Sequence, residues 1–225
     1  MSGRVKFAQK VQEVSIAVKG SVEIGASLSV VEGSDSIVVM AIVSGRGRDS
    51  SRNCFVAEEL NRAGHSTLLV DLLTSNEEEV DLQTGEYRFD IELLVERTKI
   101  ATKWITDDKK TGGMKVAYFG LNASAASALA AAAELGKTVK AVVSQGGRCD
   151  LVEFELPMVK SPTLFIVGEH DNFITTVTHN AMRRMYSENK LVVIEGAGHL
   201  FEEPGAIEEV AGAATTWLGE VLGSN

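Results

Sequence analysis

The stretch Met114–Ala125, with the sequence MKVAYFGLNASA, decides how the rest of the chain is interpreted. Its apolar and aromatic first half predicts a buried strand, and the small residues that continue after it predict a helix. A strand, a sharp turn at Gly120 and a helix outline a nucleophile elbow, in which the pattern G-x-S-x-G holds a serine on a strained turn. Asn122 stands at the third position of that pattern. Because the lone pair of an amide nitrogen is delocalised into its carbonyl, Asn122 is a poor nucleophile, and the stretch predicts a fold more clearly than a reaction.

Two further motifs place polar residues directly after apolar strands. The segment TLFIVGEHD ends at Asp171, and LVVIEGAGH ends at His199. The carboxyl ends of strands are where open α/β sheets build their sites. The order of Asn122, Asp171 and His199 is the chain order of nucleophile, acid and histidine in an α/β-hydrolase triad. We therefore expect Asp171 and His199 to contact each other beside the elbow.

Six segments resemble a known family: FGLNASAASALAAAAE, VVSQGGRCDL, PTLFIVGEHD, GAGHLFEEPGAIEEVA, SSRNCFVAEELNRAGHSTLLVDLLT and EYRFDIELLVERTKIATKWI. Together they resemble the small dienelactone-hydrolase-like branch of the α/β-hydrolase superfamily, from about residue 36 to the end. The resemblance implies a mostly parallel central sheet with helices on both faces and no cap domain. It also implies an esterase or lactonase type of hydrolase, acting on a small ester, lactone or other carbonyl ligand, with Asp171 as the acid and His199 as the base.

A second departure from the family pattern lies in the loop SGRGRDSSRN. Hydrolases of this kind supply one N–H group of the oxyanion hole from the loop at this place. Family members commonly carry His-Gly at the end of the preceding strand, whereas this chain carries Ile42 and Val43. The resemblance then assigns the oxyanion-hole N–H groups to Ser44 and Ala123.

Other polar residues are candidates for the lining of the site. Arg46 and Arg48 stand beside glycines and could bind an anionic ligand through guanidinium and backbone N–H groups, or they could belong to a solvated surface loop. Gln145 follows a predicted strand and is a candidate polar wall residue. Asp71 ends another predicted strand, where an aspartate more often holds loop backbone than takes part in chemistry.

Composition predicts one globular domain, residues 1–225, with a substantial core, because 44% of the residues are hydrophobic and 24% are charged. A net charge of −9 argues against nucleic acid or an anionic membrane as the main partner. The chain carries neither a long apolar run nor an apolar N-terminal signal, so a cytoplasmic location is expected. Cys54 and Cys149 lack metal-ligand spacing, and we expect free thiols, no metal and no cofactor. Composition does not predict an oligomeric state.

Hydrophobic periodicity predicts alternating strands and helices, which favour a parallel sheet covered on both faces. A hairpin or meander at the sheet edge is predicted for 11–32, and a polar loop at the mouth of the site for 74–87. The other predicted strands are 37–43, 65–73, 138–144, 163–168 and 191–195, and the other predicted helices are 54–63, 88–107, 172–186 and 207–222.

Three functional hypotheses remain open at this point. In the first, the protein has lost acyl transfer at Asn122 and is a natural pseudo-hydrolase or an engineered variant, whose old cleft binds a small ligand or serves as a scaffold. In the second, Ser124 replaces the missing serine, although it lies in the first helical turn and points elsewhere than the elbow residue. In the third, His199 with Asp171 acts as a general base on a bound water molecule or on a carbon acid.

Overall fold

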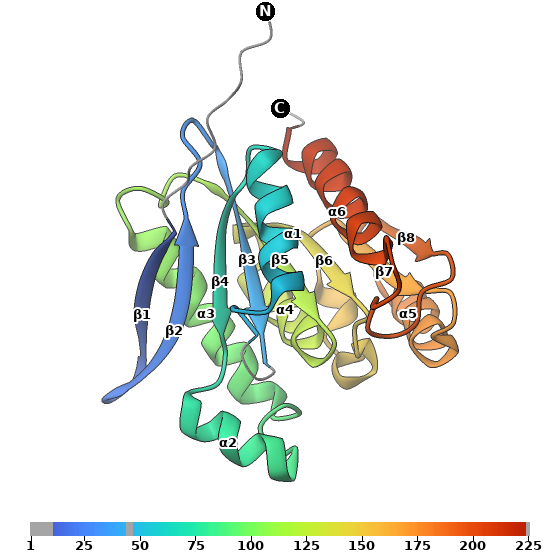
Figure 1. The fold of residues 1–225 in the computed structure, drawn as a ribbon, viewed down its shortest axis with the longest axis horizontal. Coiled ribbons are helices and arrows are strands. Elements are labelled where there is room, and N and C mark those ends of the chain that lie inside the picture. Colours follow the sequence, from blue (N-terminus) through green and yellow to red (C-terminus); the bar gives the residue numbers. More distant parts are fainter. Residues whose placement is uncertain (1–10, 44–46, 224–225) are drawn as a thin grey trace, which may run out of the picture.

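The structure of the chain, a computed structural model, describes residues 11–43 and 47–223. Within these ranges eight strands form one sheet in the order β1-β2-β4-β3-β5-β6-β7-β8 (Figure 1). Strand β2 pairs antiparallel with β1 and with β4, and the other neighbouring pairs are parallel. The bounds are β1 Gln12–Lys19, β2 Val22–Ser29, β3 Ser36–Ile42, β4 Ser66–Asp71, β5 Lys115–Leu121, β6 Val139–Gln145, β7 Thr163–Gly168 and β8 Asn189–Ile194. The mostly parallel sheet and the edge hairpin are as predicted.

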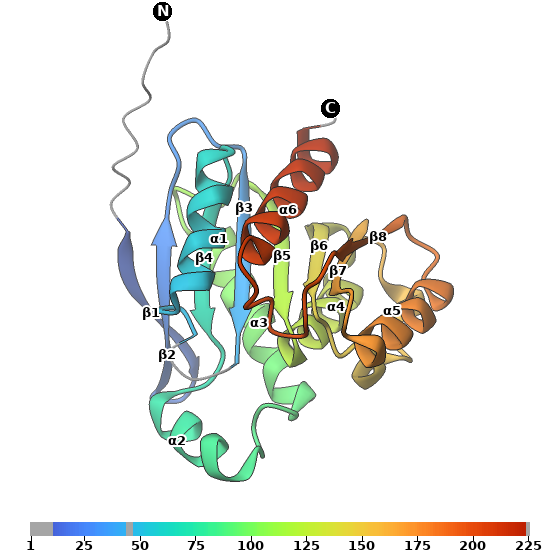
Figure 2. The same cartoon turned by 45° about the vertical axis from the view of Figure 1, so that its right-hand side comes forward.

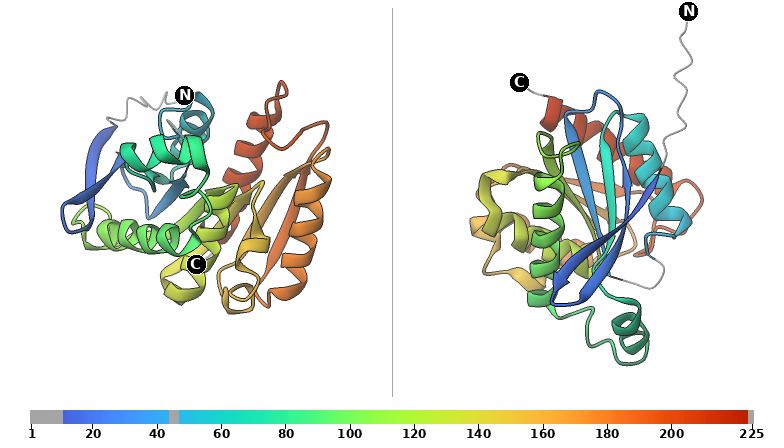
Figure 3. Two further views of the ribbon diagram at one scale, coloured as in Figure 1. Left: turned by 90° about the horizontal axis from the view of Figure 1, so that it is seen from below. Right: turned by 90° about the vertical axis from the view of Figure 1, so that its left-hand side faces the viewer.

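Helices cover both faces of this sheet. Two of them, α1 (Ser51–Arg62) and α6 (Ala206–Gly223), lie together on one face. The other face carries α3 (Ile91–Asp107), α4 (Ala123–Leu135) and α5 (Asn172–Arg184), and the view from below in Figure 3 separates the layers. Short 3-10 turns complete the described chain: η1 Gly136–Thr138, η2 Cys149–Val152 and η3 Leu156–Met158. The result is the three-layer α/β architecture that the alternation of strands and helices predicts.

Strand β3 shows why its sequence is apolar at every position. Successive side chains of a strand point to opposite faces of the sheet. One set packs in the core beneath α3 and α4, and the other packs in the core beneath α1 and α6. The first set is Ile37, Val39 and Ala41, and the second is Val38, Met40 and Ile42. A strand covered on both faces gains burial from every residue, which accounts for the unbroken apolar run.

The junction of β5 and α4 depends on small residues. A Cβ atom at Gly120 would lie 2.5 Å from the Cα atom of Ala125 and 2.8 Å from the carbonyl oxygen of Ser124. Both contacts are with backbone, so no side-chain movement could relieve them. The alanine-rich α4, whose residues 123–132 are all buried, can therefore start directly against the end of the strand. This close approach fixes the direction in which the chain leaves the sheet.

The polar segment 74–87 was predicted to be a loop, and that prediction is wrong. It contains α2 (Ser75–Thr84), which lies beyond the carboxyl ends of the strands (Figures 1 and 2). The helix begins with a capping box: the Thr74 hydroxyl accepts from the Glu77 N–H group, and the Glu77 carboxylate accepts from the Thr74 N–H group. Glu77 also binds Arg97 of α3 through two bonds of 2.6 Å. Capping and an ion pair, rather than an apolar stripe, stabilise this helix.

The remaining elements begin and end within a few residues of their predicted limits. Ser50 is the residue before α1, but its side chain makes no capping hydrogen bond in the described structure. Trp217 lies inward on α6 and is 4% exposed, packed in the core beneath α1 and α6. Among the described residues, no helix has the length and apolarity that a membrane span requires.

Replacing Gly120 with alanine tests the junction of β5 and α4. We expect Gly120→Ala to lower the free energy of unfolding by about 1–3 kcal/mol or more, because the new methyl group would overlap backbone atoms. Gly113→Ala is the matched control, since a Cβ atom there meets nothing within 4 Å. Urea denaturation of both variants measures the difference. Equal stability of the two variants would contradict this account of the junction.

Candidate active site

Asn122 occupies a strained turn between β5 and α4. Its φ is +51° and its ψ is −117°, a combination that residues with a side chain rarely adopt. Asparagine tolerates positive φ better than most residues, yet such a conformation still costs about 1–3 kcal/mol. The following residue, Ala123, already begins α4. The chain therefore keeps, at this position, the backbone shape of a nucleophile elbow.

The loop after β6 holds this turn from one side. The Asn122 N–H group donates to the Gln145 carbonyl at 3.1 Å, and the Arg148 N–H group donates to the Asn122 carbonyl at 3.0 Å. Gly146 has a φ of +58°, and a Cβ atom there would lie 3.3 Å from Asn122 Oδ1. The Gly146-Gly147 pair therefore gives the loop the backbone freedom and the space to pass directly along the elbow.

His199 and Asp171 come together beside the elbow. The distance between His199 Nδ1 and Asp171 Oδ2 is 2.5 Å. Asp171 Oδ1 also accepts the Ile174 N–H group at 3.1 Å and so caps α5, which anchors the carboxylate. The His199 side chain is 43% exposed, whereas that of Asp171 is 10% exposed. An imidazole held through Nδ1 by a buried carboxylate is the arrangement that presents Nε2 to a reacting group.

The loop that carries His199 approaches the sheet closely at Gly168, the last residue of β7. A Cβ atom there would lie 2.4 Å from the Gly198 carbonyl oxygen and 2.5 Å from that of Ala197. Phe201, which follows the histidine, is buried and has a φ of +51°. Strain and close backbone contact thus accumulate around the histidine as they do around the elbow.

A cavity of about 410 Å³ opens above the carboxyl ends of β3, β5 and β6. It contains the elbow and the histidine, together with apolar, amide and arginine side chains. The lining residues of the cavity are Ile42, Val43, Gly47, Ser50, Arg52, Asn53, Arg88, Phe89, Leu121, Asn122, Ala123, Gln145, Arg148, His199, Leu200 and Ile207. The volume suits a small ligand, and the elbow residue is in direct contact with the cavity.

Three arginines in this lining, Arg52, Arg88 and Arg148, were not predicted from the sequence. Each is held by a carboxylate: Arg52 by Glu202, Arg88 by Asp81 and Arg148 by Asp150. Of these the Asp81 carboxylate is almost fully buried, with 4% of its side chain exposed. These three acids are not among the residues that line the cavity. A ligand in the cavity therefore meets guanidinium groups first, while their counter-charges lie outside the lining.

Arg148 is the most constrained of these cations. It makes two bonds to Asp150, at 2.8 and 2.7 Å, and this hydrogen bonding holds the pKa of that carboxyl below its ordinary value. Its guanidinium also lies over the rings of Phe89 and Phe173, at 5.7 and 5.4 Å from their centroids. A sequence signal for Arg148 existed, since it follows Gly146-Gly147 at the carboxyl end of a predicted strand.

Gln145 lines the cavity, where the sequence placed a polar wall residue. Its side chain is 7% exposed, and within the described part of the chain its Oε1 atom has no hydrogen-bond partner. A buried amide oxygen without a hydrogen bond costs free energy unless a ligand or a water molecule donates one to it. Gln145 is thus a candidate for a hydrogen bond to a ligand or to water.

Ser124 is placed where its hydroxyl cannot act as a nucleophile toward a ligand in the cavity. It is fully buried under the turn, and its hydroxyl lies 2.7 Å from the Ala41 carbonyl oxygen and 2.8 Å from that of Leu121. The same oxygen accepts the Leu121 N–H group at 2.9 Å. Its hydroxyl is engaged in tying the first turn of α4 to β3 and β5. The hypothesis that Ser124 is the nucleophile is therefore wrong for this conformation.

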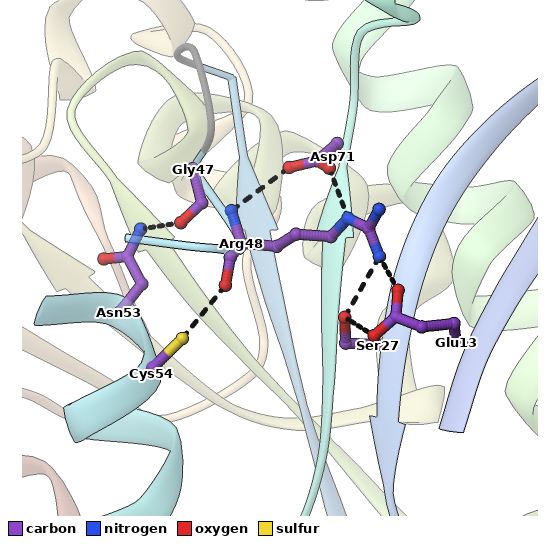
Figure 4. A network of polar contacts seen from close by, with 7 residues as sticks. All are labelled: Glu13, Ser27, Gly47, Arg48, Asn53, Cys54 and Asp71. Carbon is purple, nitrogen blue, oxygen red and sulfur yellow. Dashed lines mark hydrogen bonds and ion pairs between the residues drawn. The ribbon is translucent and has the colours of Figure 1, made fainter. Parts of the chain in front are cut away.

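The glycine-rich loop after β3 gives a mixed result. Ser44 and Arg46 lie outside the described residues, so their predicted roles stay predictions. Arg48 is not part of the cavity lining: its guanidinium binds Asp71 and Glu13 instead (Figure 4). The ligand-binding role predicted for Arg48 is thus a structural one in this arrangement. Asp71 accepts the Arg48 N–H group, which is the loop-holding role that its position favoured.

The described residues contain no cluster suited to a metal ion. No group of three or more histidine, cysteine, aspartate or glutamate side chains is close enough there to hold a metal ion.

Comparison with known proteins identifies the lineage. The model of the dienelactone hydrolase family matches residues 28–222. The chain belongs to the dienelactone hydrolase family. A solved dienelactone hydrolase from Anabaena variabilis ATCC 29413 superposes with a TM-score of 0.91 at 46% identity, covering 95% of this chain and 99% of that one. The superposition therefore takes in nearly the whole of both chains.

More distant relatives extend this comparison. Two curated proteins of Mycobacterium tuberculosis, from strains CDC 1551 and H37Rv, carry the provisional name phosphoribosyl transferase. Each is 43% identical over 207 residues, which are 92% of this chain and 46% of the relative. The chain thus spans about half the length of these curated relatives. Est1E from Butyrivibrio proteoclasticus superposes with a TM-score of 0.79 at 13% identity, covering 94% of this chain and 99% of that one, which shows a shared fold alone.

The double role of Asp171 leads to a stability prediction. Asp171→Asn keeps a capping oxygen for α5 but loses the charge that faces His199, whereas Asp171→Ala loses both. Asp90 caps α3 in the same way, through a 3.1 Å bond from the Leu93 N–H group, and has no histidine partner. We expect both alanine variants to lose about 1 kcal/mol of unfolding free energy from the cap. Urea denaturation should then show a lower unfolding free energy for Asp171→Asn than for Asp90→Asn, and equal values for these two would mean that the contact of the Asp171 carboxylate with His199 contributes nothing.

Proposed function

We propose that this member of the dienelactone hydrolase family binds a small anionic carbonyl compound in the cavity at Asn122 and forms no acyl-enzyme on that residue. The observation that carries the proposal is the conformation of Asn122. It retains the strained φ of the elbow while His199 and Asp171 remain in contact beside it. Strain that persists at a cavity supports a functional role for the position.

The chemistry of the amide decides against covalent catalysis at Asn122. A serine hydroxyl becomes a nucleophile when histidine removes its proton, but an amide N–H group is not usefully deprotonated in this way. Removing a triad nucleophile from a serine protease costs on the order of 10⁶ in turnover. Asn122 instead offers both a donor and an acceptor, which suit a hydrogen bond to a carbonyl or hydroxyl group.

The charge of the lining supports an anionic ligand. Arg52, Arg88 and Arg148 reach the cavity from three separate parts of the chain. A planar guanidinium matches the two oxygens of a carboxylate or phosphate better than an ammonium group does. Since the carboxylates that hold these arginines lie outside the lining, a ligand anion would add to the existing ion pairs rather than replace them.

A second function is favoured by the intact His199–Asp171 pair. His199, with Asp171 behind it, would take a proton from a bound water while the water oxygen attacks the ester carbon. The tetrahedral intermediate would then break its bond to the alkoxide, and the histidine would return the proton to that leaving group. This reaction consumes one water and needs no nucleophile at position 122. It would be slow hydrolysis of a small ester or lactone.

The phosphoribosyl transferase name belongs to relatives about twice as long as this chain. The part of them that aligns here corresponds largely to the region that the dienelactone hydrolase model matches. We therefore do not extend that activity to this chain.

Restoring a serine tests the proposal directly. We expect the parent protein to release little 4-nitrophenol from 4-nitrophenyl acetate. Asn122→Ser should give a burst approaching one equivalent per chain, because the elbow, the histidine and the acid are already assembled. Stopped-flow absorbance measures the burst, and intact-protein mass spectrometry detects the acetyl-enzyme.

Two controls complete this experiment. Asn122→Ala provides no nucleophile and should stay silent, and adding His199→Ala to Asn122→Ser should abolish the burst. A parent that already turns over the ester as fast as Asn122→Ser would contradict the proposal. If that turnover also disappears in His199→Ala and persists in Asn122→Ala, hydrolysis by the histidine and water replaces it.

The anionic character of the ligand is tested separately by binding. At about five times its dissociation constant, monomethyl succinate should stabilise the parent by about 1 kcal/mol, a rise in Tm of about 2–4 °C. Dimethyl succinate, which has no charge, should raise the Tm much less at the same concentration. Arg148→Met should remove the difference between the two esters, whereas Arg183→Met, on the exposed side of α5, should keep it. Equal shifts for both esters in the parent would exclude an anion-selective site.

A further inference from the structure

Arg48 joins four separate parts of the chain next to the cavity (Figure 4). Its Nε atom donates to Asp71 Oδ2 at 2.7 Å, and its own backbone N–H group donates to Asp71 Oδ1 at 3.3 Å. Its Nη1 atom donates to Ser27 Oγ at 3.1 Å and pairs with the Glu13 carboxylate. Ser27 Oγ in turn donates to Glu13 Oε1 at 2.8 Å. One side chain thereby ties the loop after β3 to β1, β2 and β4.

The edge hairpin leaves room for this guanidinium. Gly25 in β2 has no side chain, and a Cβ atom there would lie 3.2 Å from Nη2 and 3.3 Å from Cζ of Arg48. The Arg48 side chain, 23% exposed, therefore lies against the strand backbone rather than in open solvent. The space over Gly25 and the bonds to Asp71 and Glu13 together form a defined binding place for the Arg48 side chain.

The same loop forms a wall of the cavity. Gly47 and Ser50 of the loop line the cavity, together with Asn53 in the first turn of α1. The Gly47 carbonyl accepts from Asn53 Nδ2 at 2.7 Å, and the Arg48 carbonyl accepts from the Cys54 thiol at 3.2 Å. The backbone of Arg48 is therefore fixed on one side by its own ion pairs and on the other by the first turn of α1. A change at the ion pairs must be transmitted to the wall through this short piece of backbone.

We propose that Arg48 is a positioning residue that sets the cavity wall formed by Gly47, Ser50 and Asn53, with Glu13 of the edge hairpin as its outer anchor. Arg48 does not touch the ligand in this scheme. It acts by holding the wall at a constant distance from Asn122 and His199. Its kinetic consequence rests on the function proposed above, whereas its effect on the loop does not.

Cys54 supplies a readout that is independent of activity. Burial raises the pKa of its thiol, and the nearby carboxylates of Asp49 and Glu58 raise it further, so the thiol is protected while the loop stays in place. Cys149 is fully buried, with a pKa raised by burial to about 12, and reports on global opening. The reaction of the two thiols with the aromatic disulfide DTNB, assigned with Cys54→Ser, thus separates local from global loosening.

We expect Arg48→Met to speed the reaction of Cys54 about three- to tenfold while Cys149 remains unreactive. Arg183→Met is the matched control, because Arg183 is an exposed arginine of α5 that hydrogen-bonds Asn180, away from the loop and from Cys54. Unchanged Cys54 reactivity in Arg48→Met would overturn the proposal. So would a parallel rise at Cys149, since it would mean general loosening instead of local positioning.

The outer anchor is tested with a milder pair of variants. Glu13→Gln removes the charge that faces Arg48, whereas Glu23→Gln changes a carboxylate of the same hairpin that binds only Ser15 in the described structure. Cys54 should react faster in Glu13→Gln and at the parental rate in Glu23→Gln. Equal rates in both variants would overturn the role of the hairpin, even if Arg48→Met proved too unstable to measure.

A kinetic split distinguishes positioning from mere support of the fold. In the Asn122→Ser background, Arg48→Met should lower kcat for 4-nitrophenyl acetate about tenfold and leave KM nearly unchanged, because misplacement affects the reacting geometry. Arg48→Lys should recover part of kcat, since a single ammonium group can bind Asp71 but cannot also reproduce the fork. An unchanged kcat in Arg48→Met would overturn the proposal. If Asn122→Ser itself shows no burst, the proposed function fails, and the thiol rates still decide the role of Arg48.

Discussion

The reversal of the backbone at Asn122 is the constraint on which the rest of this structure depends. The chain leaves β5, passes through a positive φ and enters α4 with the Cα atom of Ala125 pressed against Gly120. Larger residues at either position would push the helix away from the sheet. The alanine-rich sequence of α4 and the glycines after β6 are both consequences of this one approach. The strain of the turn is offset by the burial that the approach makes possible.

The same geometry brings distant polar groups to one edge of the sheet. Because β3, β5, β6 and β7 are parallel, their carboxyl ends meet on one side, and the loops that follow β3, β5 and β6 line one cavity. His199 and Asp171 are held there by a capped helix and a close backbone contact at Gly168. The site therefore holds the imidazole and its carboxylate partner in place, whatever residue stands at the elbow. Such a frame can serve ligand binding as well as catalysis.

The sequence predicted those parts whose cause is local. Apolar runs identified the strands, and short motifs at their ends identified Asn122, Asp171 and His199. The helix α2 was missed because its stability comes from the Thr74 cap and from Arg97, which lies twenty residues away from Glu77 and leaves no periodic signal. Elements stabilised by residues close in sequence were predicted, and the helix stabilised by a residue distant in sequence was not.

Arginine side chains were harder still to place from the sequence. Arg48 looked like a ligand-binding residue because of its glycine-rich neighbours, but its direction is decided by Asp71 and by the space over Gly25. Arg52 and Arg88 reach the cavity through long, flexible side chains whose course depends on carboxylates from other segments. Because a guanidinium group lies several rotatable bonds from the backbone, the position of an arginine in the sequence does not predict where its charge lies. The charge of the cavity thus emerges from tertiary contacts that no motif encodes.

The contacts of Arg48 also have a consequence for how the protein folds. Glu13, Ser27, Arg48 and Asp71 come from strands and a loop that must first pair or turn before their side chains can meet. The cavity lining extends from Ile42 to Ile207, so the rim is closed by contacts of high sequence separation. Contacts between residues distant in sequence tend to form late, because forming them costs the conformational entropy of closing a long loop. We therefore expect the wall beside the elbow to be among the last parts to assemble, so that a chain with a folded sheet can still lack a finished site.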